Sequence, residues 1–181
     1  IIDIFEKNKD VVSLEGGWSE EFTFPLDGGG IQAQLFDMQT CFNLNGIDAV
    51  NASAQGGGSR GAGNAAPTAP PEAEAFERLL TNVVPELDSY SAEVVRDSLV
   101  DWLDEDENLS QNGAEDADYA ALVNPYLAAN GPMVSKSEIR LVNGVQPQWI
   151  SALLPHICVI PSISQLKINV NTITEEQAPV L

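Results

Sequence analysis

Positive charge is scarce in this sequence. Lys and Arg account for 8 of the 181 residues, against 27 Asp and Glu, and the formal net charge is -19. A surface of this sign repels nucleic-acid backbones and anionic lipid head groups, which argues against nucleic acid as a partner. Carboxylates do suit divalent cations, because hard cations prefer oxygen ligands, although most acidic surpluses are only solvated surface.

Long apolar runs, histidine and cysteine are also scarce. No apolar stretch is long enough to cross a bilayer, and no signal sequence opens the chain. The one histidine, His156, ends an apolar stretch, where packing or helix capping is favoured over catalysis. Cys41 and Cys158 lack the spacing of a zinc or redox motif, which leaves either a disulfide or two buried thiols.

Both ends of the sequence have the pattern of interrupted helices. Residues 1–10 are amphipathic but have neither a helix start signal nor a Met. Near the other end, residues 172–175 match a capping box that opens a helix, and the chain ends soon afterwards at Leu181. We therefore expect this sequence to be part of a longer protein.

Short β-prone runs separated by turn residues fill residues 11–50. The runs 21–26 and 30–36 flank Asp27-Gly28-Gly29 and predict an antiparallel hairpin, and residues 40–44 predict a further strand. A Gly, Ala, Ser and Pro-rich stretch follows at 51–71 and predicts a flexible linker.

The linker also matches two catalytic patterns, GxSxG around Ser59 and GxGxxG from Gly56 to Gly61. The first pattern requires a strand-to-helix elbow and a histidine partner, and the second requires a βαβ unit. A low-complexity glycine tract supplies neither context. A hydrolase that uses Ser59 and His156 is therefore a rejected alternative, and we expect no enzyme activity.

Helical periodicity begins after the linker. Apolar residues recur at helical spacing within 76–84 and again within 95–103, and Pro85 ends the first helix. Residues 135–138 form a capping box that predicts a third helix, and Pro147 opens a fourth that runs towards Ile157. Residues 166–170 then predict an extended segment.

An acidic loop separates the second and third of these helices. Nine acidic residues lie from Asp97 to Asp118, and no Lys or Arg occurs between Arg96 and Lys136. Counted from Asp104, oxygen-bearing side chains fall at positions 1, 3, 5, 7 and 12, which is the order of ligands in an EF-hand loop. Leu109 stands where that loop requires glycine, so the spacing leaves both a calcium site and a solvated acidic loop open.

Several blocks of the sequence, in this order, resemble one family. The blocks are Phe42-Asn43-Leu44-Asn45, residues 101–106, 113–119, 125–130 and 137–142, Leu153 to Cys158, and Ile168 to Thr172. They are similar to minor pseudopilin K of type II secretion systems, and the resemblance covers nearly the whole chain.

The resemblance implies an α+β fold with a pilin-like antiparallel sheet, the remnant of an N-terminal helix and an inserted helical domain. On this basis we expect a pilin-like segment at 1–50, a linker at 51–71, a helical insert with the acidic loop at 72–165, and an extended segment with the start of a helix at 166–181. The implied protein is a non-enzymatic subunit at the pseudopilus tip that assists protein export across the outer membrane.

The resemblance also implies partners, a compartment and a metal. The partners are the minor pseudopilins I and J, contacted through residues 1–10 and the β region, and the domain is periplasmic with an inner-membrane anchor. A periplasmic setting favours a disulfide between Cys41 and Cys158. Family members bind calcium, which favours a structural calcium site. The expected ligands, chosen by oxygen chemistry, are Asp104, Asp106, Asn108, Glu115, Asp116 and Asp118. The alternative is a periplasmic calcium-binding recruitment module outside a pseudopilus.

Overall fold

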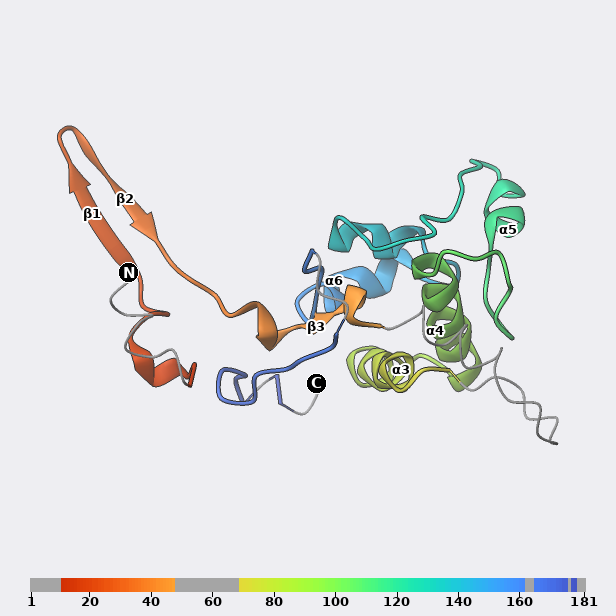
Figure 1. The fold of residues 1–181 in the computed structure, drawn as a ribbon, viewed down its shortest axis with the longest axis horizontal. Coiled ribbons are helices and arrows are strands. Elements are labelled where there is room, and N and C mark those ends of the chain that lie inside the picture. Colours follow the sequence, from red (N-terminus) through yellow and green to blue (C-terminus); the bar gives the residue numbers. More distant parts are fainter. Residues whose placement is uncertain (1–10, 48–68, 162–164, 176, 179–181) are drawn as a thin grey trace.

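A computed structural model describes residues 11–47, 69–161, 165–175, 177 and 178. The expected helix remnant at 1–10 and most of the expected linker lie outside these residues. A β-hairpin projects from one end of the molecule, and the helices gather at the other end (Figure 1). The elements, in chain order, are the 3-10 turn η1 (Leu14–Gly16), β1 (Phe22–Leu26), β2 (Gly29–Ala33), η2 (Met38–Thr40), β3 (Phe42–Asn43), η3 (Leu44–Gly46), α3 (Pro71–Val83), α4 (Ser89–Leu103), α5 (Asp116–Ala120), η4 (Lys136–Leu141), η5 (Pro147–Trp149), α6 (Ile150–Leu153) and β4 (Ile157–Cys158).

The predicted hairpin is confirmed. β1 and β2 pair antiparallel, with Phe24 opposite Ile31 and Leu26 opposite Gly29. Gly28 has a φ of 85°, a left-handed conformation that glycine adopts without steric cost, and this allows the tight turn between the strands. Alternate residues of a strand point to opposite faces, so Phe24 and Ile31 share one face while Thr23 and Gln32 share the other.

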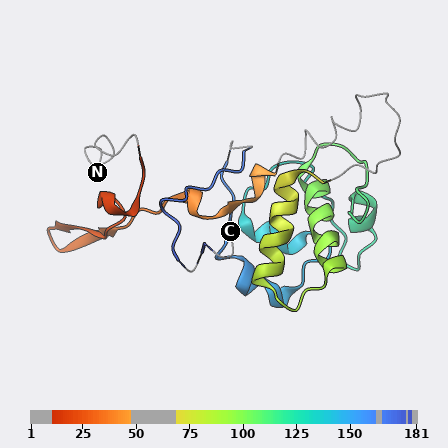
Figure 2. The same ribbon diagram turned by 90° about the horizontal axis from the view of Figure 1, so that it is seen from below.

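The two helices predicted at 76–84 and 95–103 are confirmed as parts of α3 and α4, which lie side by side (Figure 2). Pro71 opens α3 at a position where no backbone N–H donor is needed. Asp88 caps α4 by accepting the backbone N–H of Ser91 at 3.0 Å. Phe76 of α3 and Leu99 of α4 are fully buried in one core that also contains β3 and β4.

The capping box predicted at 135–138 is present, but it opens a 3-10 helix, η4, instead of an α-helix. The helix predicted from Pro147 to Ile157 is wrong at its far end, since α6 stops at Leu153. Pro155 follows two residues later and cannot continue a helix. Ile157 instead belongs to β4.

The strand predicted at 40–44 appears as β3, and its partner is distant in sequence. β3 pairs with β4 in parallel, Phe42 opposite Ile157, and forms a sheet separate from the hairpin. Buried Asn45 connects the segment after β3 to the helical region. Its side-chain amide donates to the Met133 carbonyl at 2.9 Å and accepts the Met133 N–H at 2.8 Å. The antiparallel pairing expected for the β region is therefore right for β1 and β2 and wrong for β3, which pairs in parallel.

The segment after residue 164 is extended, as predicted, and Asp37 attaches it to the β region. The Asp37 carboxylate accepts the Thr172 hydroxyl at 2.7 Å and the Asn169 amide at 2.9 Å. Thr172 is thus engaged with Asp37 and opens no helix, so the predicted capping box at 172–175 is wrong. A reciprocal pair two residues later, between Thr174 and Gln177, closes a turn there instead.

The fold is α+β, as predicted, with a small antiparallel sheet beside a helical region. Within the residues described, none of the helices has the length and apolar character needed to span a membrane.

Candidate functional site: an acidic loop at the end of helix α4

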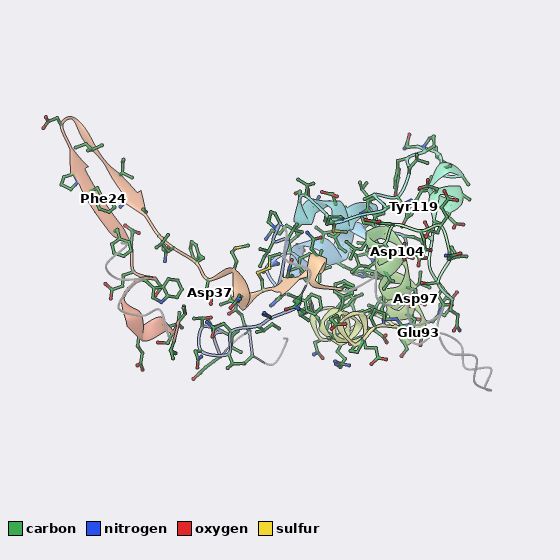
Figure 3. All side chains as sticks on the ribbon, in the orientation of Figure 1. Phe24, Asp37, Glu93, Asp97, Asp104 and Tyr119 are labelled. Carbon is green, nitrogen blue, oxygen red and sulfur yellow. A yellow bond between two sulfur atoms is a disulfide. The ribbon has the colours of Figure 1, made fainter. Side chains whose placement is uncertain are left out.

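Three aspartates follow one face of α4 towards the acidic loop. Asp97, Asp101 and Asp104 are four and three residues apart, a spacing that places them on the same side of a helix. All three are buried, with exposed fractions of 5%, 0% and 5%. Figure 3 shows Asp97 and Asp104 along α4, with Tyr119 of α5 near the end of the helix. Carboxylates are rarely buried without partners, so each one requires an explanation.

Asp97 is neutralised by the basic residue beside it. Arg96 donates to the Asp97 carboxylate at 2.8 Å and also pairs with Glu77 of α3 at 2.5 Å. The second Asp97 oxygen accepts the backbone N–H of Asn112 at 3.2 Å. Asp97 therefore connects the α3–α4 pair to the far side of the acidic loop.

Asp101 of α4 anchors the acidic loop to the helix. Both of its oxygens accept the backbone N–H of Ser110 at 3.2 Å. Gly113 lies against the same carboxylate, so closely that a Cβ at position 113 would collide with Oδ2. Burial raises the pKa of Asp101 to about 6, against the opposing hydrogen bonds from Ser110 and with a further contribution from the Asp97 charge.

Asp104 and Glu115 are the two carboxylates that lack such partners. Asp104 Oδ1 and both oxygens of Glu115 are buried without a hydrogen-bond partner. Glu115 lies in the capping-box position at the start of α5, opposite the Asp118 N–H, but makes no hydrogen bond of good geometry to it. Unpartnered buried carboxylate oxygens are unfavourable unless a proton or a cation joins them.

The pKa values of this pair reflect the same surroundings. Burial raises the pKa of Asp104 to about 7, and the charges of Asp106 and Asp101 add to the shift. Burial likewise raises the pKa of Glu115 to about 7, helped by the charges of Asp101 and Asp104. A cation between the two carboxylates would favour their charged forms and would oppose these upward pKa shifts.

Of the other four expected ligands, three carboxylates already accept backbone N–H groups, and the fourth residue is exposed. Asp106 accepts the Asn108 N–H at 2.7 Å in a local turn, and Asn108 itself is exposed. Asp116 accepts the Ala128 N–H at 2.9 Å, and Asp118 accepts the Glu115 N–H at 3.1 Å. The charges of Asp106 and Asp116 contribute to the raised pKa of Glu115, so both lie close to it.

The donor set fits a hard divalent cation in its chemistry. In the described part of the chain, no three Asp, Glu, His or Cys side chains are gathered tightly enough to hold one ion. The three unpartnered oxygens of Asp104 and Glu115 are nevertheless oxygen donors of the kind that calcium prefers. A cation bound there would supply the missing positive charge.

An aromatic cluster supports this end of α4, and the sequence pattern did not reveal it. The rings of Trp102 and Tyr119 form a T-shaped pair with centroids 5.3 Å apart, and the ring centroid of Tyr126 lies 5.3 Å from that of Tyr119. The Tyr119 hydroxyl accepts the N–H of Asn143 at 3.1 Å, and burial raises the pKa of Tyr119 to about 12. The cluster connects α4, α5 and the segment around residue 126.

The two cysteines form a disulfide, which confirms that expectation. Cys41 and Cys158 are 117 residues apart in sequence, and their Cα atoms are 5.7 Å apart. The bond lies beside the β3–β4 pair and holds the β region to the end of the helical region. Ser59 of the rejected hydrolase lies outside the described residues, and the half-buried His156 has a buried Nδ1 without a hydrogen-bond partner.

Comparisons with known proteins agree with the resemblance noted in the sequence. The family model described as type II secretion system protein K matches residues 40–162. The type II secretion system protein K of Aeromonas hydrophila is 37% identical, with 100% of this chain and 53% of the relative covered. That of Pectobacterium carotovorum subsp. carotovorum is 40% identical, with 91% of this chain and 47% of the relative covered.

A solved structure is similar as well. It is the crystal structure of the GspK–GspI–GspJ complex from the type II secretion system of enterotoxigenic Escherichia coli, with a TM-score of 0.78 and 30% identity over 99% of this chain and 59% of that one. The chain spans about half the length of the curated relatives it matches. The family match and the structural similarity together lead to one conclusion: this chain belongs to the type II secretion system protein K family.

Proposed function

We propose that this protein is the minor pseudopilin K of a type II secretion system, a structural subunit at the tip of the pseudopilus that assists protein export across the outer membrane. The observation that carries the proposal is the similarity, over 99% of this chain, to a K subunit solved in complex with I and J. The partners are then the I and J pseudopilins of the same system. The protein works by its shape and contact surfaces and not by catalysis.

The proposed location is the periplasm, with an inner-membrane anchor in the full-length protein. The Cys41–Cys158 disulfide supports an oxidising compartment, since cytosolic thiols are kept reduced. This bond constrains a chain segment of 117 residues, which suits a domain that must stay folded outside the cytosol.

The hairpin is the proposed contact surface of the β region. Phe24, Leu26 and Ile31 are large apolar side chains, and each has an exposed fraction between 44% and 57%. Phe24 and Ile31 are paired across the strands and lie on one face. An isolated two-stranded hairpin is only marginally stable in water, so an apolar face of this kind is stabilised when another surface covers it.

A structural calcium ion is proposed at the acidic loop. Asp104 and Glu115 would hold it, because their buried oxygens lack partners, and Asp106 and Asp116 would add negative charge nearby. Asn108 and Asp118 complete the predicted ligand set and remain predictions. When bound, the ion supplies positive charge that joins the ends of α4 and α5.

The proposed role in export is tested in a strain that lacks its own K subunit. Expression of the full-length protein is expected to restore export of the strain's secreted proteins, measured as their amount in the medium. A control strain lacking the channel of the system stays deficient. If the protein folds and accumulates in the periplasm but export is not restored, the role in secretion is wrong and the calcium-binding recruitment module becomes the better account.

A further inference from the structure

A small pocket opens where η4, η5 and α6 meet. Its volume is about 120 Å³, and it is lined by Arg140, Val145, Pro147 and Ile150. None of these residues belongs to the acidic loop, the hairpin or the disulfide. An apolar cavity only slightly larger accommodates a benzene molecule, so this pocket has room for one Val or Leu side chain.

Local structure holds the walls of the pocket in place. Gly144 has a φ of 83°, and the turn around it is closed by the Val145 N–H, which donates to the Val142 carbonyl at 3.2 Å. Pro147 opens η5, and its ring fixes its own backbone angle. Ile150 is buried, with an exposed fraction of 5%. The pocket is therefore formed before any ligand enters it.

Arg140 adds a positive charge to this pocket. The residue is exposed, and within the described part of the chain the ion pairs of Lys and Arg all belong to Arg96. The carboxylate of Glu138, two residues earlier, instead accepts two backbone N–H groups at the start of η4, at 2.9 and 2.7 Å. Lys136 donates to the Leu154 carbonyl at 3.0 Å. Of the two cations of η4, Arg140 is therefore the one available to an external anion.

An arginine beside an apolar pocket suits a carboxylate that is joined to an aliphatic group. The guanidinium group is planar and always charged, and it can donate two parallel hydrogen bonds to one carboxylate. The pocket in turn favours an aliphatic side chain, because burial removes apolar surface from water. The net charge of -19 repels anions in general, so a ligand needs both contacts to stay bound.

The closeness of the charge to the pocket favours the end of a peptide chain as the ligand. In a C-terminal Val or Leu residue, the carboxylate and the aliphatic side chain are attached to the same Cα atom. In an extended chain, by contrast, an acidic side chain and its aliphatic neighbour point to opposite faces. Such an internal pair would not reach both Arg140 and the pocket.

We propose that this pocket is a binding site for the C-terminus of a partner protein, in which Arg140 pairs with the terminal carboxylate and the apolar walls take the last aliphatic side chain. The site does not depend on the calcium ion proposed above or on the assembly with I and J. Its failure would leave both of those proposals unchanged.

Three short peptides test the site on the wild-type protein. The first, acetyl-Gly-Gly-Leu, ends in a free carboxylate. The second is the same peptide with a C-terminal amide, and the third, acetyl-Leu-Asp-Gly amide, carries its carboxylate on the side chain next to leucine. Binding is measured by NMR titration, followed at the methyl groups of Val145 and Ile150.

The first peptide is expected to bind at least about tenfold more tightly than the other two, because only its carboxylate can pair with the guanidinium group while its side chain fills the pocket. If either control peptide binds as tightly as the first, the proposal is overturned. The absence of any shift at the two methyl groups would overturn it as well.

Variants at Arg140 then test the role of its charge. Arg140→Gln is expected to raise the Kd of the first peptide about tenfold and to leave that of the amide within about twofold. Arg140→Lys keeps the charge but loses the planar fork, so an intermediate Kd is expected. Arg78→Gln removes an equally exposed arginine from α3 and is expected to bind as the wild type does. Equal weakening by Arg140→Gln and Arg78→Gln would assign the effect to net charge and would overturn the role of Arg140.

Discussion

Both carboxylate oxygens of Asp101 accept the backbone N–H of Ser110, each at 3.2 Å. The contact turns a fully buried aspartate of α4 into an anchor for the loop that follows the helix. Gly113 leaves room for the same carboxylate, since a Cβ at position 113 would overlap Asp101 Oδ2. The loop thus has a fixed shape before any ion is considered.

The close approach of Gly113 to Asp101 predicts the effect of one added methyl group. Gly113→Ala is expected to lower the free energy of unfolding by about 1–3 kcal/mol, because the new Cβ would overlap Asp101 Oδ2. Gly131→Ala is the matched control, since its Cβ would meet its nearest atom at 3.8 Å. Urea unfolding of both variants measures the difference. Equal stabilities would show that the Asp101 side chain moves aside without loss of stability.

The raised pKa values predict how stability depends on pH when calcium is removed. The folded pKa values of Asp104 and Glu115, about 7, lie above the ordinary values of 3.8 and 4.5, so the folded state binds more protons than the unfolded state between about pH 4 and 7. The stability that these groups contribute is present below about pH 4 and is lost as the pH rises through 7.

Urea unfolding in the presence of a chelator, from pH 4.5 to 8, measures this slope. Asp104→Asn with Glu115→Gln is expected to flatten it, since neutral amides do not titrate. Asp37 has the opposite effect on stability, and only at lower pH. Burial alone would raise its pKa, but hydrogen bonds, led by the one from Thr172, hold the pKa below the ordinary value. The stability that Asp37 contributes is therefore lost as the pH falls, not as it rises. A slope that stays the same in the double variant would assign the effect to other groups.

Calcium is expected to raise the unfolding temperature. A ligand that binds only the folded state adds about 2.7 kcal/mol at one hundred times its Kd, which corresponds to about 5–10 °C for a domain of this size. Asp104→Asn with Glu115→Gln is expected to abolish the shift. Glu105→Gln with Glu107→Gln removes the same charge from exposed positions and is expected to retain it. An undiminished shift in the first pair would place the ion elsewhere.

The disulfide predicts a large loss of stability on its removal. Cys41→Ser with Cys158→Ser is expected to cost about 2–5 kcal/mol, because the unfolded chain regains the freedom of a loop of 117 residues. Chemical reduction of the native protein provides the control and should give the same loss. If the serine variant were as stable as the oxidised protein, the bond would contribute little to the fold.

The apolar face of the hairpin predicts a contact surface. Phe24→Ser with Ile31→Ser is expected to weaken the complex with I and J at least about tenfold, as the loss of central apolar contacts does in interfaces. Thr23→Ser with Gln32→Ser changes the opposite face of the same strands and serves as the control. Affinity measured by calorimetry distinguishes the two, and unchanged binding in both pairs would place the interface outside the hairpin.

Local patterns were the most informative part of the sequence. The hairpin turn at Asp27-Gly28, the apolar periodicity of α3 and α4 and the capping box at Ser135 and Glu138 each depend on neighbouring residues, and the structure contains all of them. The row of carboxylates on α4 also has a local signature, because Asp97, Asp101 and Asp104 have helical spacing. The EF-hand spacing that starts at Asp104 leaves out Asp97 and Asp101, although both are buried in the same row.

Features that depend on residues far apart in the sequence could not be predicted from local patterns. The parallel pairing of β3 with β4 joins positions more than one hundred residues apart. Thr172 leaves its expected capping role because Asp37, far back in the chain, accepts its hydroxyl. The segment after α5 returns to the end of α4, where the Gly131 N–H donates to the Trp102 carbonyl. None of these contacts has a signature in the local sequence.

Assembly with I and J tests the central claim most directly. The protein is mixed with the soluble domains of the I and J pseudopilins from the same secretion system, and the elution and mass of the mixture are measured by size-exclusion chromatography with light scattering. A single species that contains all three proteins is expected. Three separately eluting proteins, with this one folded and its disulfide intact, would contradict the assignment to the pseudopilus.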